Sequence, residues 1–350
     1  MSVFKIDSIR VMPGEKMCTR LPVTNGLLPD GSKVEIPIII LNGMKKGPVF
    51  TVFAAVHGGE VTGTPAIINV SKDLDPQSLS GTLIGIPAAN PLAFITQTRG
   101  WIMDEPQALK NLNRVFPGKI DGTITQRIAY TIFNQIILRS TVTLDFHTWG
   151  YGVPMVGYRY GFGELSRKSF ELADVSATKL ILKESIHHGT THTEGAKHGI
   201  VTVNAETMGG LPMPALEEHI KLWEKTMINI MKKLDMVEGE PDFPEHIYIE
   251  IMRETANYLL GKVGTPVRGE LTTIKPIKNP GFMIPYVKLM DRVSKNQKLA
   301  SIINLFGEEV EAIYSPCDDG IVTRIRRNVV QPGDNPIGIA HIIDREDMFD

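Results

Sequence analysis

Cysteine is nearly absent from this chain of 350 residues, in which Cys18 and Cys317 are the only two. They stand far apart in the sequence and neither belongs to a Cys-x-x-Cys pair, so a disulfide framework is excluded. Because so little cysteine is typical of proteins from reducing compartments, we expect a cytoplasmic protein. The first ten residues, MSVFKIDSIR, also lack the pattern of a secretory signal peptide.

An excess of charge of one sign and long apolar runs are lacking as well. The formal net charge is -2, from 37 lysines and arginines and 39 aspartates and glutamates. No basic stripe with interleaved aromatic residues is present, so nothing in the sequence indicates a nucleic-acid partner. No apolar run approaches the roughly 20 residues that a membrane-spanning helix needs, so we expect no membrane partner either.

Apolar, strand-like runs alternate with helical stretches over the first two thirds of the chain. Helical periodicity is clear at 125–138 and 214–236. The strand-like runs are 35–41, 49–56, 82–88, 141–146 and 200–205. With 42% hydrophobic residues the chain can bury a full core. The alternation predicts an α/β fold, a mixed or mostly parallel sheet flanked by helices on both faces.

The composition changes near residue 238, where the charged, proline-broken stretch EGEPDFPE begins. Beyond this linker, glycine and proline punctuate short β-like runs up to the end of the sequence. We therefore predict two domains: an α/β domain at residues 1–238 and a β-rich domain at 239–350.

The stretch VFTVFAAVHGGEVTGTPAIINV, residues 49–70, changes from strand to helix character near His57 and Glu60. Open α/β sheets place their ligands at such strand ends. A phosphate loop is excluded, because GGEVTG lacks the lysine of a Walker sequence and the spacing of a dinucleotide fingerprint. A plain turn histidine would not explain Glu60. An imidazole and a carboxylate three residues apart can instead bind one zinc ion.

A third ligand is expected at another strand end, in STVTLDFHTWGYG. The period of two places Asp145 and His147 on one side of this strand. His147 can bind the metal while Asp145 orients an imidazole from behind. Two nitrogens and one carboxylate leave a fourth position for water, which is the set expected of a catalytic zinc rather than a structural one.

A general base is expected at the end of the strand GIVTVNAETMGG, where Glu206 precedes a Gly-Gly turn. A glutamate beside a catalytic zinc can take a proton from water and pass it to a leaving nitrogen. A solvated turn glutamate is the alternative, and the apolar strand that leads into Glu206 argues against it.

Six short motifs carry a family resemblance. They are HGGE at 57–60, NP at 90–91, TR at 98–99, NLNRVFPG at 111–118, DFHT at 145–148 and ET at 206–207. Together they resemble the succinylglutamate desuccinylase and aspartoacylase family, a branch of the zinc carboxypeptidase-like hydrolases. The resemblance implies a carboxypeptidase-like α/β domain with one zinc per chain. The implied reaction is hydrolysis of a small N-acyl amino acid to a carboxylate and a free amine.

The resemblance also implies a role for each matching residue. His57, Glu60 and His147 match the metal ligands, and Glu206 matches the base. Arg99 matches the arginine that polarises the scissile carbonyl and holds the oxyanion, where a fixed cation can contribute several kcal/mol. Asn113 and Arg114 match the pair that grips the substrate carboxylate, a task suited to the guanidinium fork.

The sequence departs from the family pattern at Gly59 and Asn111, where relatives commonly have acidic residues. Relatives that act on aspartate derivatives have an arginine in the segment before the base. In this chain the corresponding residues 187–198 contain several histidines and a lysine instead. We expect a solvated loop and assign it no role, with a pocket mouth or a second metal site as alternatives. The sequence therefore leaves open whether the protein selects substrates with an acidic side chain.

The C-terminal third resembles the barrel of biotinyl and lipoyl carrier domains, at GFMIPYVKLMDRVSKNQKLASI and YSPCDDGIVTRI. The corresponding turn, NLFGEEVEAIYSP, lacks the modifiable lysine, so we predict neither biotin nor lipoate. We expect this module to shape the active site and to pack against another subunit in a homo-oligomer. A peptide-trimming zinc carboxypeptidase and a non-catalytic zinc-binding protein remain the alternative functions.

Overall fold

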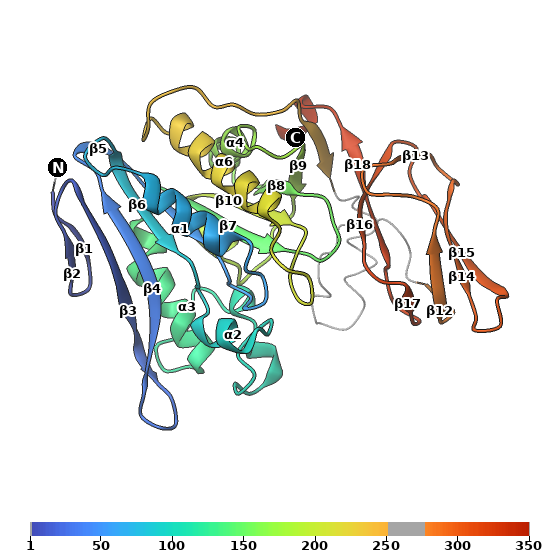
Figure 1. Ribbon diagram of the computed structural model, residues 1–350, viewed down its shortest axis with the longest axis horizontal. Helices are drawn as coiled ribbons and strands as arrows, with labels where there is room; N and C mark the ends of the chain where they lie inside the picture. The colour runs from blue at the N-terminus through green and yellow to red at the C-terminus, as the bar shows by residue number, and fades with distance from the viewer. Residues whose placement is uncertain (1, 251–276, 350) are drawn as a thin grey trace. The chain divides into compact units, whose positions relative to one another are not determined.

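The computed structural model describes residues 2–250 and 277–349 (Figure 1). The chain divides into two compact units. The first consists of Met1–Trp149, Pro154–Lys179 and Ser185–His246, and the second of Gly150–Val153, Leu180–Glu184 and Ile247–Asp350. The predicted boundary between residues 238 and 239 stays a prediction.

The first unit contains a mixed sheet with strands in the spatial order β3, β4, β6, β5, β7, β10 and β8. The central strands β6, β5, β7 and β10 run parallel, and β3, β4 and β8 join antiparallel. The strands are β3 (Glu15–Leu27), β4 (Lys33–Asn42), β5 (Lys45–Phe53), β6 (Ser80–Ile86), β7 (Val142–Thr148), β8 (Met155–Arg159) and β10 (Val201–Thr207). The short strands β1 (Phe4–Ile6) and β2 (Ile9–Val11) form a separate hairpin.

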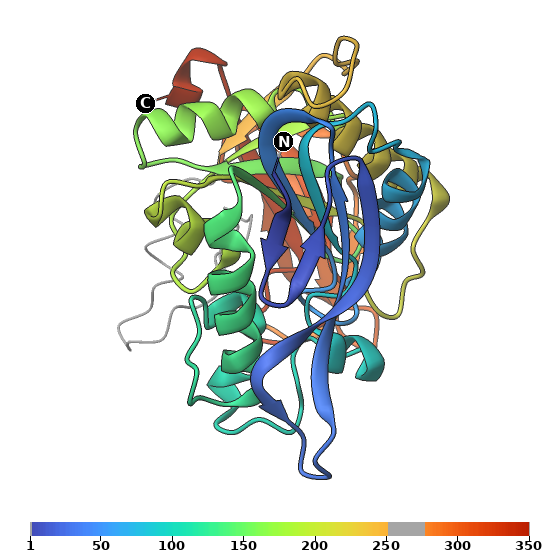
Figure 2. The same cartoon turned by 90° about the vertical axis from the view of Figure 1, so that its left-hand side faces the viewer.

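Helices cover both faces of this sheet (Figure 2). On one face Trp223 of α6 stacks on Phe146 of β7, and α1 and α4 lie on the same side. On the other face, Ile128 and Ile132 of α3 share a core with Phe53 of β5. The helices are α1 (Gly63–Asp73), α2 (Pro91–Thr96), α3 (Ile124–Gln135), α4 (Glu164–Ala173), α5 (Thr191–Lys197) and α6 (Glu217–Lys233). The predicted α/β fold with a large mixed sheet is confirmed.

The second unit is β-rich. Strands β9 (Leu180–Glu184), β11 (Ile247–Glu250), β18 (Ile337–Ile343), β16 (Gly320–Ile325) and β13 (Arg292–Val293) pair in that order. A second sheet has the order β15 (Glu309–Tyr314), β14 (Lys298–Ile303), β12 (Gly281–Pro285) and β17 (Val329–Val330). Met283 and Leu299 of the second sheet share one apolar core with Val322 and Ile339 of the first.

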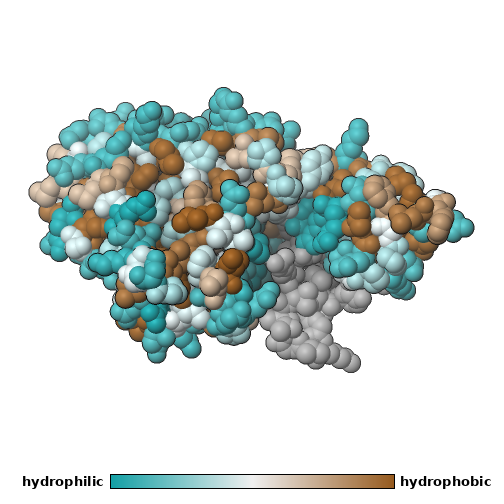
Figure 3. Space-filling model, turned by 60° about the horizontal axis from the view of Figure 1, so that its bottom comes forward, coloured by the Kyte–Doolittle hydropathy of each residue, from teal (hydrophilic) through white to brown (hydrophobic). Residues whose placement is uncertain are grey.

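Apolar side chains gather on the surface of the second unit over the end that carries β14 and β15 (Figure 3). At the turn between these strands, Leu305 is 94% exposed and Phe306 is 91% exposed. In the described part of the chain, no helix combines the length and the apolar character needed to cross a membrane.

The turn between β5 and α1 carries His57 and Glu60, and Gly58 packs against the backbone of α2 within it. A Cβ atom at Gly58 would lie 1.9 Å from the carbonyl oxygen of Ala93, whereas one at Gly59 would come no closer than 3.3 Å to any atom. The Gly58 amide also donates to the carbonyl of Thr98 at 2.9 Å. Only glycine fits at position 58 without moving the backbone of α2.

We therefore predict that Gly58→Ala lowers the free energy of unfolding by about 1–3 kcal/mol, because the added methyl overpacks a rigid contact. Gly59→Ala is the matched control and should change it much less. Urea denaturation followed by circular dichroism measures both. Equal stability of Gly58→Ala and the wild type would show that the turn can move freely.

Candidate active site

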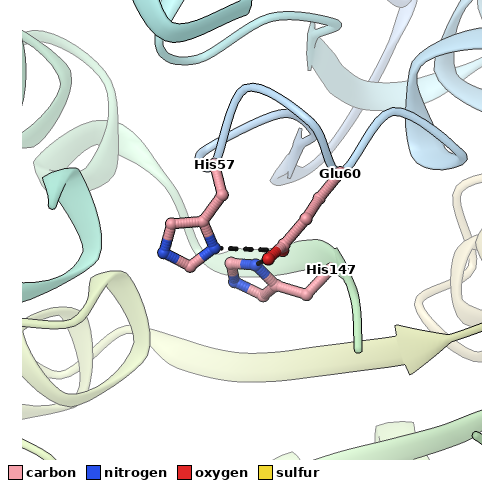
Figure 4. Close-up of side chains that lie close together, drawn as sticks. All are labelled: His57, Glu60 and His147. Carbon is pink, nitrogen blue, oxygen red and sulfur yellow. Dashed lines mark hydrogen bonds and ion pairs between the residues drawn. The ribbon is translucent and has the colours of Figure 1, made fainter. Parts of the chain in front are cut away.

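Three side chains meet where two neighbouring parallel strands end. His57 and Glu60 follow β5, and His147 lies at the end of β7. Strands β5 and β7 pair in parallel with Phe53 opposite Asp145, so their carboxyl ends reach the same edge of the sheet. Figure 4 shows the three side chains pointing toward one another from these two segments. The structure thus brings together the three residues predicted as metal ligands.

The distances within this His-Glu-His cluster are short. Oε2 of Glu60 lies 3.0 Å from Nδ1 of His57 and 2.9 Å from Nδ1 of His147. One potential ligand atom from each residue falls within 4.8 Å of the others, and all three residues are buried. Among the residues that the structure describes, this is the one such group of three or more.

The outward-facing nitrogen of each imidazole has its own acceptor. Nε2 of His57 lies 3.0 Å from Oδ1 of Asn111, which also accepts from the backbone amide of Asn113 at 2.9 Å. Since that oxygen can only accept, Nε2 of His57 carries the proton and Nδ1 is free for a metal. Nε2 of His147 lies 3.1 Å from Oδ2 of Asp145, as predicted for an orienting carboxylate. Both rings therefore present Nδ1 to the centre, which fits a metal ion.

The pKa values of the three clustered side chains are shifted in different directions. Burial lowers the pKa of His57 to about 4. Burial by itself would also lower the pKa of His147, but the charges and hydrogen bonds of Asp145 and Glu60 together outweigh it and hold that pKa well above its usual value. Burial would raise the pKa of Glu60, but His57 and His147 hold it well below its usual value. A divalent cation would satisfy the same two carboxylates.

The remaining predicted residues surround the cluster. Nη1 of Arg99 donates to Oε1 of Glu60 at 3.0 Å, while its side chain stays 41% exposed. The amide of Asn113 lies 3.3 Å from Nε2 of His147, and Nη1 of Arg114 donates to the Asn113 carbonyl at 2.6 Å. Glu206 is half-buried on β10 and pairs in register with His147, so it lies at the same sheet edge.

The sequence did not indicate the positions of several other residues near the cluster. His192 is buried on α5 with its ring edge toward that of His147, at 6.3 Å between centroids. The expectation of a solvated loop is therefore wrong for His192, although His188 and His198 are exposed. Thr191 donates to Oδ2 of Asp145 at 2.6 Å. Buried Arg159 ends β8, and no local sequence pattern indicated it.

We predict that Asn111 sets metal affinity through His57. Asn111→Leu keeps the volume but removes the acceptor, so zinc affinity should fall about 10- to 100-fold, as is typical when such a partner is lost. Asn111→Asp should retain or raise the affinity. Competition with a chromophoric chelator measures it, and Asn69→Leu, at an exposed position on α1, is the control. An unchanged affinity in Asn111→Leu would contradict the assignment.

Comparisons with known proteins indicate one family. A sequence model described as the succinylglutamate desuccinylase/aspartoacylase catalytic domain matches residues 46–234. An N-alpha-acetyl-L-2,4-diaminobutyric acid deacetylase from Halomonas elongata is 26% identical over 336 residues, which cover 93% of this chain and 91% of the relative.

Solved structures share the fold over nearly the whole chain. The product-bound ectoine utilization protein EutE (DoeB) from Ruegeria pomeroyi has a TM-score of 0.80 at 20% identity, covering 97% of this chain and 98% of that one. A succinylglutamate desuccinylase/aspartoacylase from Rhodobacter sphaeroides has a TM-score of 0.78 at 20% identity, covering 94% and 96%. With the family match spanning more than half of its residues, the chain belongs to the succinylglutamate desuccinylase/aspartoacylase family.

Proposed function

We propose that this chain hydrolyses the amide bond of a small N-acyl amino acid and releases a carboxylate and a free amine. One observation carries the proposal: the His-Glu-His cluster converges beside Glu206, which is in register with His147 on the next strand. Family membership supports the proposal, as does the deacetylase activity named for the Halomonas elongata relative.

The metal of this proposal is one zinc ion per chain, held by His57, Glu60 and His147. Two imidazole nitrogens and one carboxylate are the donor set of catalytic zinc sites, and both Nδ1 atoms point to the centre. When bound, zinc supplies Lewis acidity toward the substrate carbonyl and toward water.

Four side chains perform the remaining steps of the proposed reaction. Glu206 takes a proton from the attacking water and returns it to the leaving nitrogen. Arg99, which is half-exposed and already adjacent to the cluster through Glu60, holds the charge that develops on the carbonyl oxygen. Asn113 and Arg114 bind the substrate carboxylate. Asn113 is suited to this task because its Oδ1 accepts from the backbone amide of Thr191, which leaves the Nδ2 group to donate to a carboxylate.

We also propose that the β-rich second unit is a carrier-like barrel that carries no cofactor. Its two sheets enclose one core, and the turn between β14 and β15 presents Leu305 and Phe306 rather than a lysine. The exposure of these two apolar side chains supports a homo-oligomer.

The test of the proposed function is a screen of N-acetyl, N-succinyl and N-formyl amino acids beside short unmodified peptides. Release of free amine from an acyl amino acid, and not from the peptides, is the expected result. Cleavage of the peptides alone would favour the zinc carboxypeptidase, and no turnover with zinc bound would favour a non-catalytic protein.

On the best substrate we predict that Glu206→Gln lowers kcat by ~10²–10⁴-fold, the typical contribution of a general base, while KM changes little. Zinc content and thermal stability should stay at wild-type values, since the amide is nearly isosteric and Glu206 is no ligand. Glu217→Gln, on the exposed start of α6, is the matched control. Near-normal kcat in Glu206→Gln would refute the base assignment.

A further inference from the structure

Arg159 lies on the same face of the sheet as the proposed base. Strand β8 pairs antiparallel with β10, with Gly157 opposite Asn204 and Met155 opposite Glu206. Because strand side chains alternate between faces, Arg159 and Gly157 point to the side of Glu206. Residues 185–191 link Arg159 to the site, because the Ser185 carbonyl accepts from Arg159 and the Thr191 amide donates to Oδ1 of Asn113 at 3.1 Å.

The guanidinium of Arg159 is buried and fixed in place. Arg159 is 7% exposed, and its Nη1 donates to the carbonyl of Ser185 at 2.9 Å. The same carbonyl oxygen lies 2.9 Å from Nδ1 of His187. An arginine buried at this depth is uncommon, because removing a charge from water is costly unless other groups compensate.

The charge of Arg159 interacts with two groups of the proposed active site. Burial, and then the positive charge of Arg114, lowers the pKa of Arg159 to about 9, while the negative charge of Glu206 opposes this effect. At pH 7 the guanidinium is still charged. Burial lowers the pKa of His187 to about 4, so this neighbour is neutral. Two guanidinium groups and one carboxylate thus share this part of the site.

We propose that Arg159 is a second substrate-binding arginine, which holds the free carboxylate of the N-acyl amino acid together with Arg114. A carboxylate has two oxygens that can each accept from a guanidinium, and an anion between two like charges relieves their repulsion. The inference rests on the proposed function and adds selectivity: the site takes acyl amino acids with a free carboxylate in preference to their neutral amides.

The test compares the best N-acetyl amino acid of the screen with its primary carboxamide, on the zinc-loaded protein. Arg159→Gln should raise KM for the acid about 10- to 100-fold, the effect of losing a charged hydrogen bond, and leave KM for the carboxamide nearly unchanged. Arg159→Lys keeps the charge but not the two-pronged geometry of the guanidinium, so its KM for the acid should lie between those of the wild type and Arg159→Gln. Arg114→Gln should show the same selective loss, and the double variant should lose less than the product of the two single effects.

A matched control is Arg324→Gln, which alters another buried arginine, in the second unit. It should leave the preference for the acid at the wild-type value. If Arg159→Gln raises KM equally for acid and carboxamide, or changes neither, Arg159 does not bind the carboxylate. If Arg159→Gln does not fold, Arg159→Lys replaces it. A weaker preference of Arg159→Lys for the acid over the carboxamide would then support the inference, and an unchanged preference would contradict it.

A binding measurement separates this inference from the proposed function. Isothermal titration of the zinc-loaded wild type and Arg159→Gln with the N-acetyl amino acids and their carboxamides needs no turnover. Selective loss of acid binding in Arg159→Gln would support the inference even if the wild type hydrolysed none of the compounds. Equal binding of acid and carboxamide by the wild type would overturn the inference even in an active deacylase.

Discussion

Glu60 contacts two imidazoles at once, and the arrangement of the first unit around it follows from that contact. One carboxylate oxygen lies within 3.0 Å of Nδ1 of both His57 and His147, although the histidines come from segments far apart in the sequence. The contact requires β5 and β7 to be parallel neighbours that end together. It also requires the turn after β5 to press Gly58 against α2, where a side chain has no room.

Acidic and basic side chains lie close to one another around the cluster at this edge of the sheet. Asp145 lies behind His147, Arg99 bridges to Glu60, and the negative charge of Glu206 acts on Arg159 against the positive charge of Arg114. Each buried charge therefore has an opposite charge within reach, which offsets the cost of taking it out of water. This arrangement suits the proposed amide hydrolysis, with the proposed metal ligands at the centre, the proposed base Glu206 at one side and guanidinium groups that could bind substrate anions.

The sequence could predict the parts of the site that follow from local pattern. A β-branched run that ends in polar residues located His57, Glu60, Asp145, His147 and Glu206, because strand ends carry function in open sheets. It could not predict β8, since a five-residue strand interrupted by Gly157 has too little periodicity to be distinguished from a loop. Burial of His192 depends on α5 packing against β10, a tertiary contact without a local signature. The role of Asn111 likewise became visible only when its oxygen was seen to face His57.

The central claim is that one zinc ion binds between the two Nδ1 atoms and the Glu60 carboxylate. Anomalous diffraction at the zinc edge, from crystals of the purified protein, tests it most directly. The account predicts one strong peak per chain at about 2.0–2.2 Å from Nδ1 of His57, Nδ1 of His147 and a carboxylate oxygen of Glu60. A zinc peak held by other residues, coordination through the Nε2 atoms, or no peak here after incubation with zinc would contradict it.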